Sequence, residues 1–195
     1  RLLESAVTPV GARPVARYGA EARLLKTPFL DRRVRIATEG AGALDPLDMA
    51  AYEASGGFSA LKNCVERNDP SATIQLILDS GLRGRGGGGF PTGKKWSAVA
   101  SVSAERKYVI INGDEGDPGA FMDRMVLESY PFRVIEGAII AALAVGASDA
   151  LFYIRAEYPL ATQRVRAAIE QCRAREYIGQ NVCGGGRSVD VHVHD

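Results

Sequence analysis

Residues 107–121, KYVIINGDEGDPGAF, decide the fold of this chain. The first five residues are mostly apolar and rich in β-branched side chains, which is typical of a strand buried in a parallel sheet. The residues that follow are glycines, acids and a proline, which form turns and loops. The stretch therefore predicts a buried strand that ends in a polar loop.

Strands and helices alternate in the chain after this stretch. The apolar pattern predicts helices near 123–129, from 131 to 146 and over 159–173, and strands over 150–155 and 187–195. Such alternation is typical of an α/β fold, in which a Rossmann-like parallel sheet is flanked by helices. A buried stripe of Val165, Ile169 and Cys172 is expected on the last helix.

The part of the chain before the sheet is predicted to be helical or extended. Residues 1–27 have little periodicity and are interpreted as a linker or extension, and residues 28–195 as one domain. Asp45 and Pro46 are expected to open a helix that runs to about Ser55. Helices over 58–67 and 71–79 follow.

The loop after the first strand carries polar groups suited to a ligand. Ligands of open α/β sheets bind beyond the carboxyl ends of the strands, which is where this loop falls. Asn112 offers a donor and an acceptor, whereas Asp114, Glu115 and Asp117 only accept. Carboxylates repel phosphate, so we expect them to face hydroxyl and N–H groups. Ordinary turn chemistry and calcium binding are alternatives, although the spacing of an EF-hand is absent.

A glycine-rich stretch precedes the first strand and reads GLRGRGGGGFPTGKKW over residues 81–96. Its glycines leave backbone N–H groups free to approach an anion. Four cations surround them, namely Arg83, Arg85, Lys94 and Lys95. The stretch predicts a phosphate-binding loop and therefore a nucleotide-binding protein.

Known phosphate-loop patterns fit this stretch only in part. The string G-x-G-x-x-G from Gly84 to Gly89 follows a predicted helix, whereas the dinucleotide fingerprint follows a strand. The string from Gly88 to Lys94 resembles a P-loop, but Lys95 replaces the Ser or Thr that holds Mg²⁺. A Mg-ATP-dependent phosphotransferase therefore remains an alternative. A flexible linker is disfavoured by the flanking Phe90 and Trp96.

Together the two loops resemble those of a family of FMN- and NADH-binding subunits. This family includes the flavoprotein subunit of respiratory complex I, the diaphorase subunits of NAD-linked hydrogenases and the beta subunits of NAD-dependent formate dehydrogenases. The resemblance extends over about residues 28–195, and DEGDPGAFMDR over 114–124 is closer to the hydrogenase and formate dehydrogenase branches.

The resemblance implies a role for each matching residue. FMN and the pyrophosphate of NADH would be wrapped by Gly84, Arg85, Gly86, Gly87 and Gly89. Phe90 would stack on adenine, and Lys95 would reach the FMN side of the pocket. Gly93 is also expected to bind a cofactor. The flavin edge and ribityl hydroxyls would be held by Asn112, Asp114 and Glu115.

Two positions depart from the family pattern. Asp117 stands near the expected nicotinamide position, where it is the candidate catalytic residue, but the family often carries Glu there. Ala98 stands where some members have a second stacking Phe. A non-catalytic nucleotide-binding assembly subunit is therefore a second alternative.

The resemblance implies a flavoprotein subunit that passes a hydride between NAD(H) and FMN. Electrons would be relayed to iron–sulfur subunits and a catalytic dehydrogenase or hydrogenase subunit. The family also carries a [4Fe–4S] cluster, but its ligands are absent from this stretch, so the domain is interpreted as truncated at its C-terminus.

Composition excludes several other classes. The formal net charge of +1 disfavours nucleic-acid binding, and the longest apolar run, 134–145, is too short to span a membrane.

The three cysteines, Cys64, Cys172 and Cys183, lack metal-site spacing and fit a reducing compartment, which favours a cytoplasmic location or the periphery of a membrane complex. His192 and His194 share one strand face, but an exposed face is favoured over a metal site.

Overall fold

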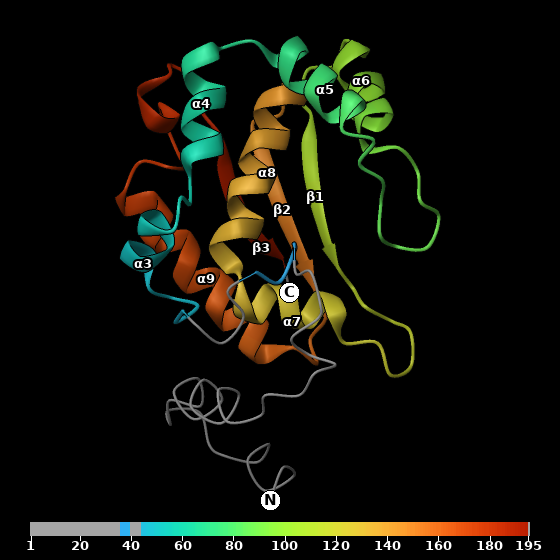
Figure 1. The fold of residues 1–195 in the computed structure, drawn as a ribbon, viewed down its shortest axis with the longest axis vertical. Helices are drawn as coiled ribbons and strands as arrows, with labels where there is room; N and C mark the ends of the chain where they lie inside the picture. Colours follow the sequence, from blue (N-terminus) through green and yellow to red (C-terminus); the bar gives the residue numbers. More distant parts are fainter. Residues whose placement is uncertain (1–35, 40–43, 195) are drawn as a thin grey trace, which may run out of the picture. The chain divides into compact units, whose positions relative to one another are not determined.

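The computed structural model of the chain describes residues 36–39 and 44–194. The chain divides into two units, residues 1–45 and 46–195, and the second carries the elements described below. In chain order (Figure 1) these are α3 (Met49–Ala54), α4 (Ser59–Arg67), α5 (Pro70–Asp79), α6 (Thr92–Ser101), β1 (Tyr108–Gly113), α7 (Met122–Ser129), α8 (Pro131–Val145), β2 (Asp149–Ile154), α9 (Pro159–Ala174), the short 3-10 helix η2 (Val182–Gly184) and β3 (Asp190–His194).

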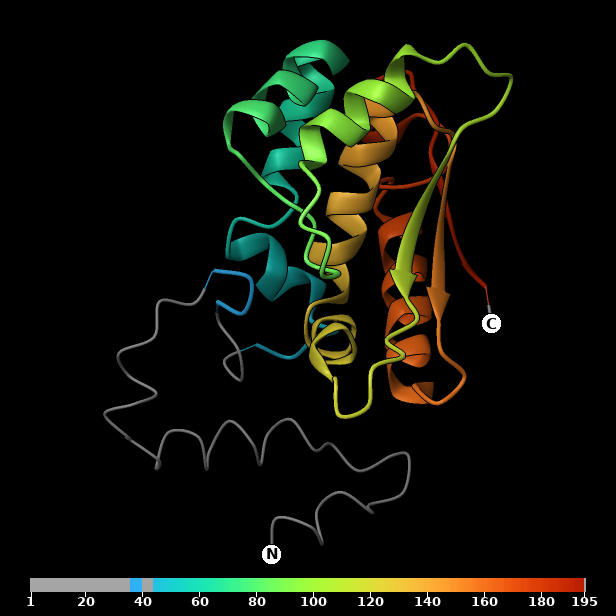
Figure 2. The same cartoon turned by 90° about the vertical axis from the view of Figure 1, so that its right-hand side faces the viewer.

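The sheet consists of parallel strands in the order β1, β2, β3. Crossovers between parallel strands are right-handed, and the strand order does not reverse, so α8 and α9 cover the same face. Figure 2 shows the sheet nearly edge-on, with α8 to its left. The predicted α/β fold, a parallel sheet flanked by helices, is confirmed for the described residues.

The other face of the sheet is open. On this face Tyr108 is 46% exposed, Ile110 57% and Tyr153 47%. The residues that alternate with them point towards the helices, and Ala150 and Phe152 are fully buried. The expectation of a buried first strand is therefore wrong for this face, because no helix of the described residues covers it.

Helix α8 lies at the centre of the hydrophobic core. Its Ile135 and Ile139 are fully buried, and it ends at Gly146, whose φ of 77° is in the left-handed region that favours glycine. Helix α9 adds the predicted stripe of Val165, Ile169 and Cys172, which are at most 4% exposed.

One charged side chain is buried in this core. Glu136 of α8 is 7% exposed, and its carboxylate accepts hydrogen bonds from the backbone N–H groups of Phe58 (2.9 Å) and Leu61 (3.2 Å). These groups open α4, so Glu136 caps that helix from another element. Tyr52 donates a third bond of 2.6 Å to the same carboxylate. Burial is the main cause that raises the pKa of the Tyr52 phenol, and the bond to Glu136 raises it further. This role of Glu136 was not predicted from the sequence.

The helices before the glycine-rich stretch are confirmed, with one change. Helix α3 begins at Met49, and its N-cap is Asp48, whose carboxylate accepts a bond of 2.9 Å from Ala51. Capping by Asp45 and Pro46 is therefore wrong, because residues 46 and 47 lie in a turn before the helix. The predicted boundary between residues 27 and 28 lies outside the described residues.

Candidate functional site

The glycine loop, residues 84–90, is closed at its base by backbone hydrogen bonds. Gly84 donates to the carbonyl of Phe90 (2.9 Å), and Thr92 donates to the carbonyl of Leu82 (2.9 Å). Arg83 adds a bond of 3.0 Å to the carbonyl of Gly89. The base is thus fixed between α5 and α6, while the tip carries no regular structure.

The tip of this loop is open around its backbone. A Cβ placed on Gly86 or Gly88 would meet no described atom within 4 Å, and neither residue has a positive φ. By contrast, Gly87 has a φ of 94° and Gly89 a φ of 57°, which favour glycine for backbone reasons. At Gly86 and Gly88 nothing in the described part of the chain calls for glycine, and a ligand has room to approach the backbone.

Positive side chains next to the tip have no acidic partner in the described residues. Arg85, Lys94 and Lys95 are exposed, and no carboxylate of the described residues forms an ion pair with them. Lys94 and Lys95 lie in the first turn of α6, where the positive end of the helix dipole adds to their charge. This arrangement favours an anion such as a phosphate group.

Gly93 lies away from the tip, in the packing between two helices. It is buried in α6, and a Cβ there would come within 2.7 Å of the backbone nitrogen of Leu78 in α5. The structure therefore gives Gly93 a role in close helix packing. Its predicted contact with a cofactor stays a prediction.

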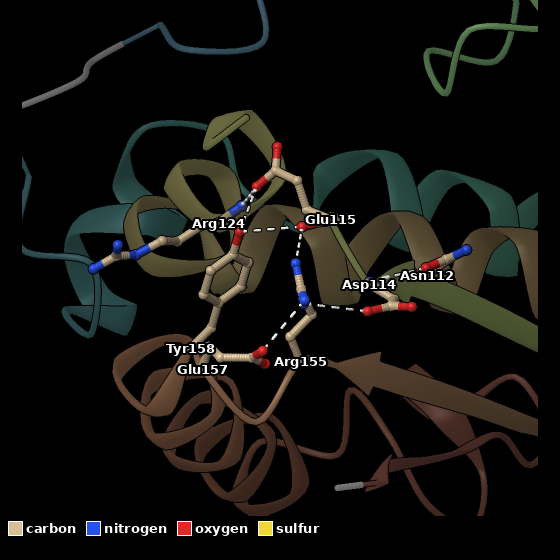
Figure 3. A network of polar contacts seen from close by, with 7 residues as sticks. All are labelled: Asn112, Asp114, Glu115, Arg124, Arg155, Glu157 and Tyr158. Carbon is tan, nitrogen blue, oxygen red and sulfur yellow. Dashed lines mark hydrogen bonds and ion pairs between the residues drawn. The ribbon is translucent and has the colours of Figure 1, made fainter. Parts of the chain in front are cut away.

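The acidic loop, residues 112–121, begins in the last two residues of β1 and is held by the protein itself (Figure 3). The side-chain oxygen of Asn112 accepts a bond of 2.9 Å from the backbone N–H of Asp114. This bond fixes the orientation of the amide and directs the NH₂ group of Asn112 away from the loop (Figure 3). Asn112 and Asp114 thus offer a donor and an acceptor at the carboxyl end of β1.

Glu115 caps helix α7. Its carboxylate accepts bonds from the backbone N–H groups of Asp123 (3.0 Å) and Arg124 (3.2 Å). Tyr158 donates a further bond of 3.2 Å. Desolvation by itself raises the pKa of the Glu115 carboxyl, but these hydrogen bonds outweigh it and hold the pKa below its ordinary value.

Two residues of this network stand outside the sequence motifs and were not predicted. Arg155, which follows β2, donates a bond of 2.6 Å to the carbonyl of Glu115 and lies 3.4 Å from the carboxylate of Asp114. Tyr158 comes from the same β2–α9 connection. The signal was available in principle, because residues that follow neighbouring parallel strands meet at one edge of the sheet.

The remaining predicted residues are exposed. Phe90 is 55% exposed at the end of the glycine loop, and Ala98 is exposed on α6. Asp117 is exposed in the acidic loop, where its carbonyl accepts a bond from Ala120. In Figure 1 both loops project beyond β1 on the same side of the unit, although no hydrogen bond or ion pair joins them in the described residues.

Other candidate features lie outside these loops. A cavity of about 350 Å³ lies between the α3–α4 turn and α8 and is lined by residues that include Tyr52, Arg133 and Glu136. The three cysteines are free, and the described residues contain no group of three metal-ligating side chains and no helix long and apolar enough to cross a membrane. His192 and His194 are exposed on the open sheet face.

Sequence comparison identifies related proteins. Residues 77–195 match the family model of the Nuo51 FMN-binding domain. The F 2 subunit of the NADH-quinone oxidoreductase of Rhizobium meliloti (strain 1021) is 42% identical over 146 residues, which are 75% of this chain and 35% of that protein. NADP-reducing hydrogenase subunit HndC of Solidesulfovibrio fructosivorans is 43% identical over 162 residues, which are 83% of this chain and 33% of that protein. The chain thus spans about a third of the length of these curated relatives.

Solved structures show the same fold. The crystal structure of an NAD⁺-reducing [NiFe]-hydrogenase in the H₂-reduced state matches with a TM-score of 0.62 and 34% identity, over 75% of this chain and 24% of that chain. The air-oxidised state gives a TM-score of 0.61 and 28% identity, over 95% of this chain and 30% of that chain. The two curated relatives are about equally similar to this chain, so their identities favour neither the quinone oxidoreductases nor the hydrogenases.

Proposed function

We propose a function from one premise: the chain belongs to the family of the Nuo51 FMN-binding domain. The whole protein acts as a flavoprotein subunit that exchanges a hydride between NAD(H) and FMN. The observation that carries this proposal is the pair of loops on one side of β1. One loop offers an open glycine backbone with exposed cations, and the other offers fixed polar groups (Figure 1).

The residues divide between the anionic and the neutral parts of the cofactors. Backbone N–H groups of the glycine loop, with Arg85 and Lys95, bind the phosphates. Asn112 and Asp114 bind the hydroxyls and ring edge of FMN, which suit a donor and an acceptor placed side by side. Phe90, which is 55% exposed, is free to stack on an adenine ring.

FMN, when bound, supplies the chemistry that couples two-electron hydride exchange to single-electron transfer. The side chains of this chain bind and orient the two ring systems. Asp117 is the residue that we assign to the nicotinamide, and its exposed carboxylate has no ion-pair partner among the described residues. Glu115 supports the site indirectly by holding the acidic loop, because its carboxylate caps α7.

The wider setting follows from the named relatives, which are subunits of larger redox enzymes. We infer partners of the same kind: iron–sulfur electron-transfer subunits and a hydrogenase, formate dehydrogenase or quinone-reducing unit. The three free cysteines support a reducing compartment such as the cytoplasm.

The visible spectrum of the natively purified full-length protein tests this function. We expect a flavin band that bleaches anaerobically on addition of NADH, and FMN in the supernatant after denaturation. A protein that is colourless even after reconstitution with FMN, and that binds Mg-ATP, would instead support the phosphotransferase alternative. NADH binding without transfer to any acceptor would support the non-catalytic alternative.

Two substitutions connect the function to the loops. Arg85→Ala and Asp114→Ala should each lower the FMN content. The first removes a cation that binds phosphate, and the second removes an acceptor for a ligand hydroxyl group. Arg67→Ala is the matched control, since it removes an exposed cation at the end of α4, away from both loops. Full FMN occupancy in both loop variants would refute this site.

A further inference from the structure

We infer that Arg155 is the positioning residue of the acidic loop: it holds Asp114 and the backbone of Glu115 in the arrangement that the flavin site needs. This inference rests on the proposed function and deepens it. Arg155 comes from the β2–α9 connection and belongs to neither of the loops that the sequence motifs define.

The sheet register brings Arg155 to this position. Gly113, the last residue of β1, pairs with Ile154, the last residue of β2. The next residues along the two strands, Asp114 and Arg155, therefore leave the sheet side by side. The Arg155 guanidinium reaches across to β1, with one nitrogen 2.6 Å from the carbonyl of Glu115 and another 3.4 Å from the Asp114 carboxylate (Figure 3).

The charge of Arg155 matters because the acidic loop carries three carboxylates and no cation of its own. Among the described residues, the one ion pair that reaches these carboxylates comes from Arg155. The nearby Arg124 directs its side chain to Glu128 at 2.8 Å. Without Arg155, repulsion between the carboxylates would favour a more open loop.

Arg155 is the more buried partner of this pair, and its guanidinium also pairs with Glu157 at 3.2 Å. Its side chain is 29% exposed, whereas that of Asp114 is 50% exposed. The guanidinium thus holds one Asp114 oxygen, and the exposed part of the carboxylate stays available to a ligand. A planar fork with fixed donors suits this task better than the flexible ammonium of lysine.

Tyr158 fastens the loop at a second point. Its hydroxyl donates a bond of 3.2 Å to the Glu115 carboxylate, next to the carbonyl that Arg155 holds. Residue 158 is also the N-cap position of α9. The acidic loop is therefore tied to β2 and α9 as well as to α7, which keeps Asn112 and Asp114 in place before any cofactor arrives.

The chain offers a matched control at the other end of the same strands. Arg106, which precedes β1, forms an ion pair of 3.3 Å with Asp149 at the start of β2. This pair also joins the two strands, but at their amino ends, opposite to the acidic loop. Its removal tests what the loss of an arginine bridge costs the fold alone.

The experiment compares Arg155→Gln, Arg155→Lys and Arg106→Gln in the full-length protein. Three quantities are measured: the Kd for FMN by flavin fluorescence, the midpoint potential of bound FMN, and the thermal unfolding temperature. We expect Arg155→Gln to weaken FMN binding about tenfold, because a charge-assisted contact behind the site is lost. Its midpoint potential should move to more negative values, because the carboxylates near the flavin lose their cation. Arg155→Lys should recover most of the potential but less of the affinity.

The control and the wild-type protein separate the positioning role of Arg155 from the proposed function. Arg106→Gln should leave the Kd for FMN within about twofold, because this pair lies at the other end of the strands from the acidic loop and the Arg106 side chain is itself exposed. Equal effects of Arg106→Gln and Arg155→Gln on FMN would overturn the positioning role, as would an unchanged Kd and potential in Arg155→Gln. If the wild-type protein itself fails to bind FMN, the proposed function is overturned and this inference with it.

Discussion

The glycine loop and the acidic loop lie on the same side of β1 but are built in opposite ways. The glycine loop is fixed at its base, and its tip makes no contact that would call for glycine at residues 86 and 88. The acidic loop is tied by Arg155 and Tyr158 of the β2–α9 connection and by the cap that Glu115 places on α7. The polar groups at the tip of the glycine loop are free for a ligand, whereas many polar groups of the acidic loop form hydrogen bonds within the protein.

The difference suits the chemistry that we propose for each loop. A phosphate group is charged, and backbone N–H groups that can close around it bind it well. A flavin edge is flat and neutral, so its recognition depends on donors and acceptors held at fixed positions. An open loop and a preorganised loop are therefore expected to respond differently to substitution, and four substitutions test this difference.

Gly93→Ala should have the largest effect and should act on stability. The added methyl group would approach the backbone of Leu78 at 2.7–2.8 Å, and α5 and α6 would have to separate. Overpacking of this kind costs about 1–3 kcal/mol. Denaturant-induced unfolding measures it, with Gly137→Ala as the control, because that exposed position of α8 has room for a methyl group. Equal stability of the two variants would contradict the packing role of Gly93.

Gly86→Ala should affect FMN instead of stability. Because the methyl group meets no protein atom, unfolding should change little, or stability should rise by about 0.4–1 kcal/mol. A phosphate close to the backbone would be displaced, and we expect FMN affinity to fall about tenfold, which is about 1.4 kcal/mol. Titration of the apoprotein with FMN measures this. Unchanged affinity would mean that the open tip is not the phosphate site.

Glu115→Gln should destabilise the acidic loop by about 1 kcal/mol, as is typical for the loss of a helix cap. The folded pKa of this carboxyl lies below its ordinary value of 4.5, so its contribution is complete above about that pH and is lost as the pH falls through the lower folded pKa. Unfolding of wild type and variant is therefore compared between pH 7 and acid. A difference that persists undiminished in acid would argue against an ionised cap.

Lys95→Gln should have the smallest effect. The side chain is exposed, so removal of its charge should weaken FMN binding about two- to fivefold at low salt. Added KCl should erase the difference, because exposed charges are screened over about 10 Å at 0.1 M salt. The effect of Arg155→Gln should resist salt, since that arginine is only 29% exposed. Identical salt dependence of the two variants would weaken the contrast between the loops.

Local sequence patterns predicted much of the fold. The apolar run of α8 with Gly146 at its end, and the stripe of Val165, Ile169 and Cys172, depend on neighbours within a few residues. The open sheet face was not predicted, because burial of Ile110 depends on which elements pack above it. The cap of α3 was misplaced by three residues, because Asp45 and Asp48 are both acceptable caps by composition.

The site was predictable where its residues are close in sequence. The glycines of the tip and the pair Asn112 and Asp114 stand in compact motifs. Arg155 lies about 40 residues from the loop that it holds, and only the strand register relates the two. Gly93 shows the converse, since its place in a motif suggested a ligand while its surroundings show helix packing. Motifs point to candidate ligand-binding residues more readily than to the residues that support them.

The open face of the sheet has a practical consequence for anyone who produces residues 46–195 alone. Tyr108, Ile110 and Tyr153 would form an apolar surface in contact with solvent, on a parallel sheet of a kind that is normally covered on both faces. Such a fragment should self-associate and give broad elution profiles at high concentration. Ile110→Thr keeps a β-branched side chain and lowers the apolar area, and it should improve the yield of monomer without disturbing either loop.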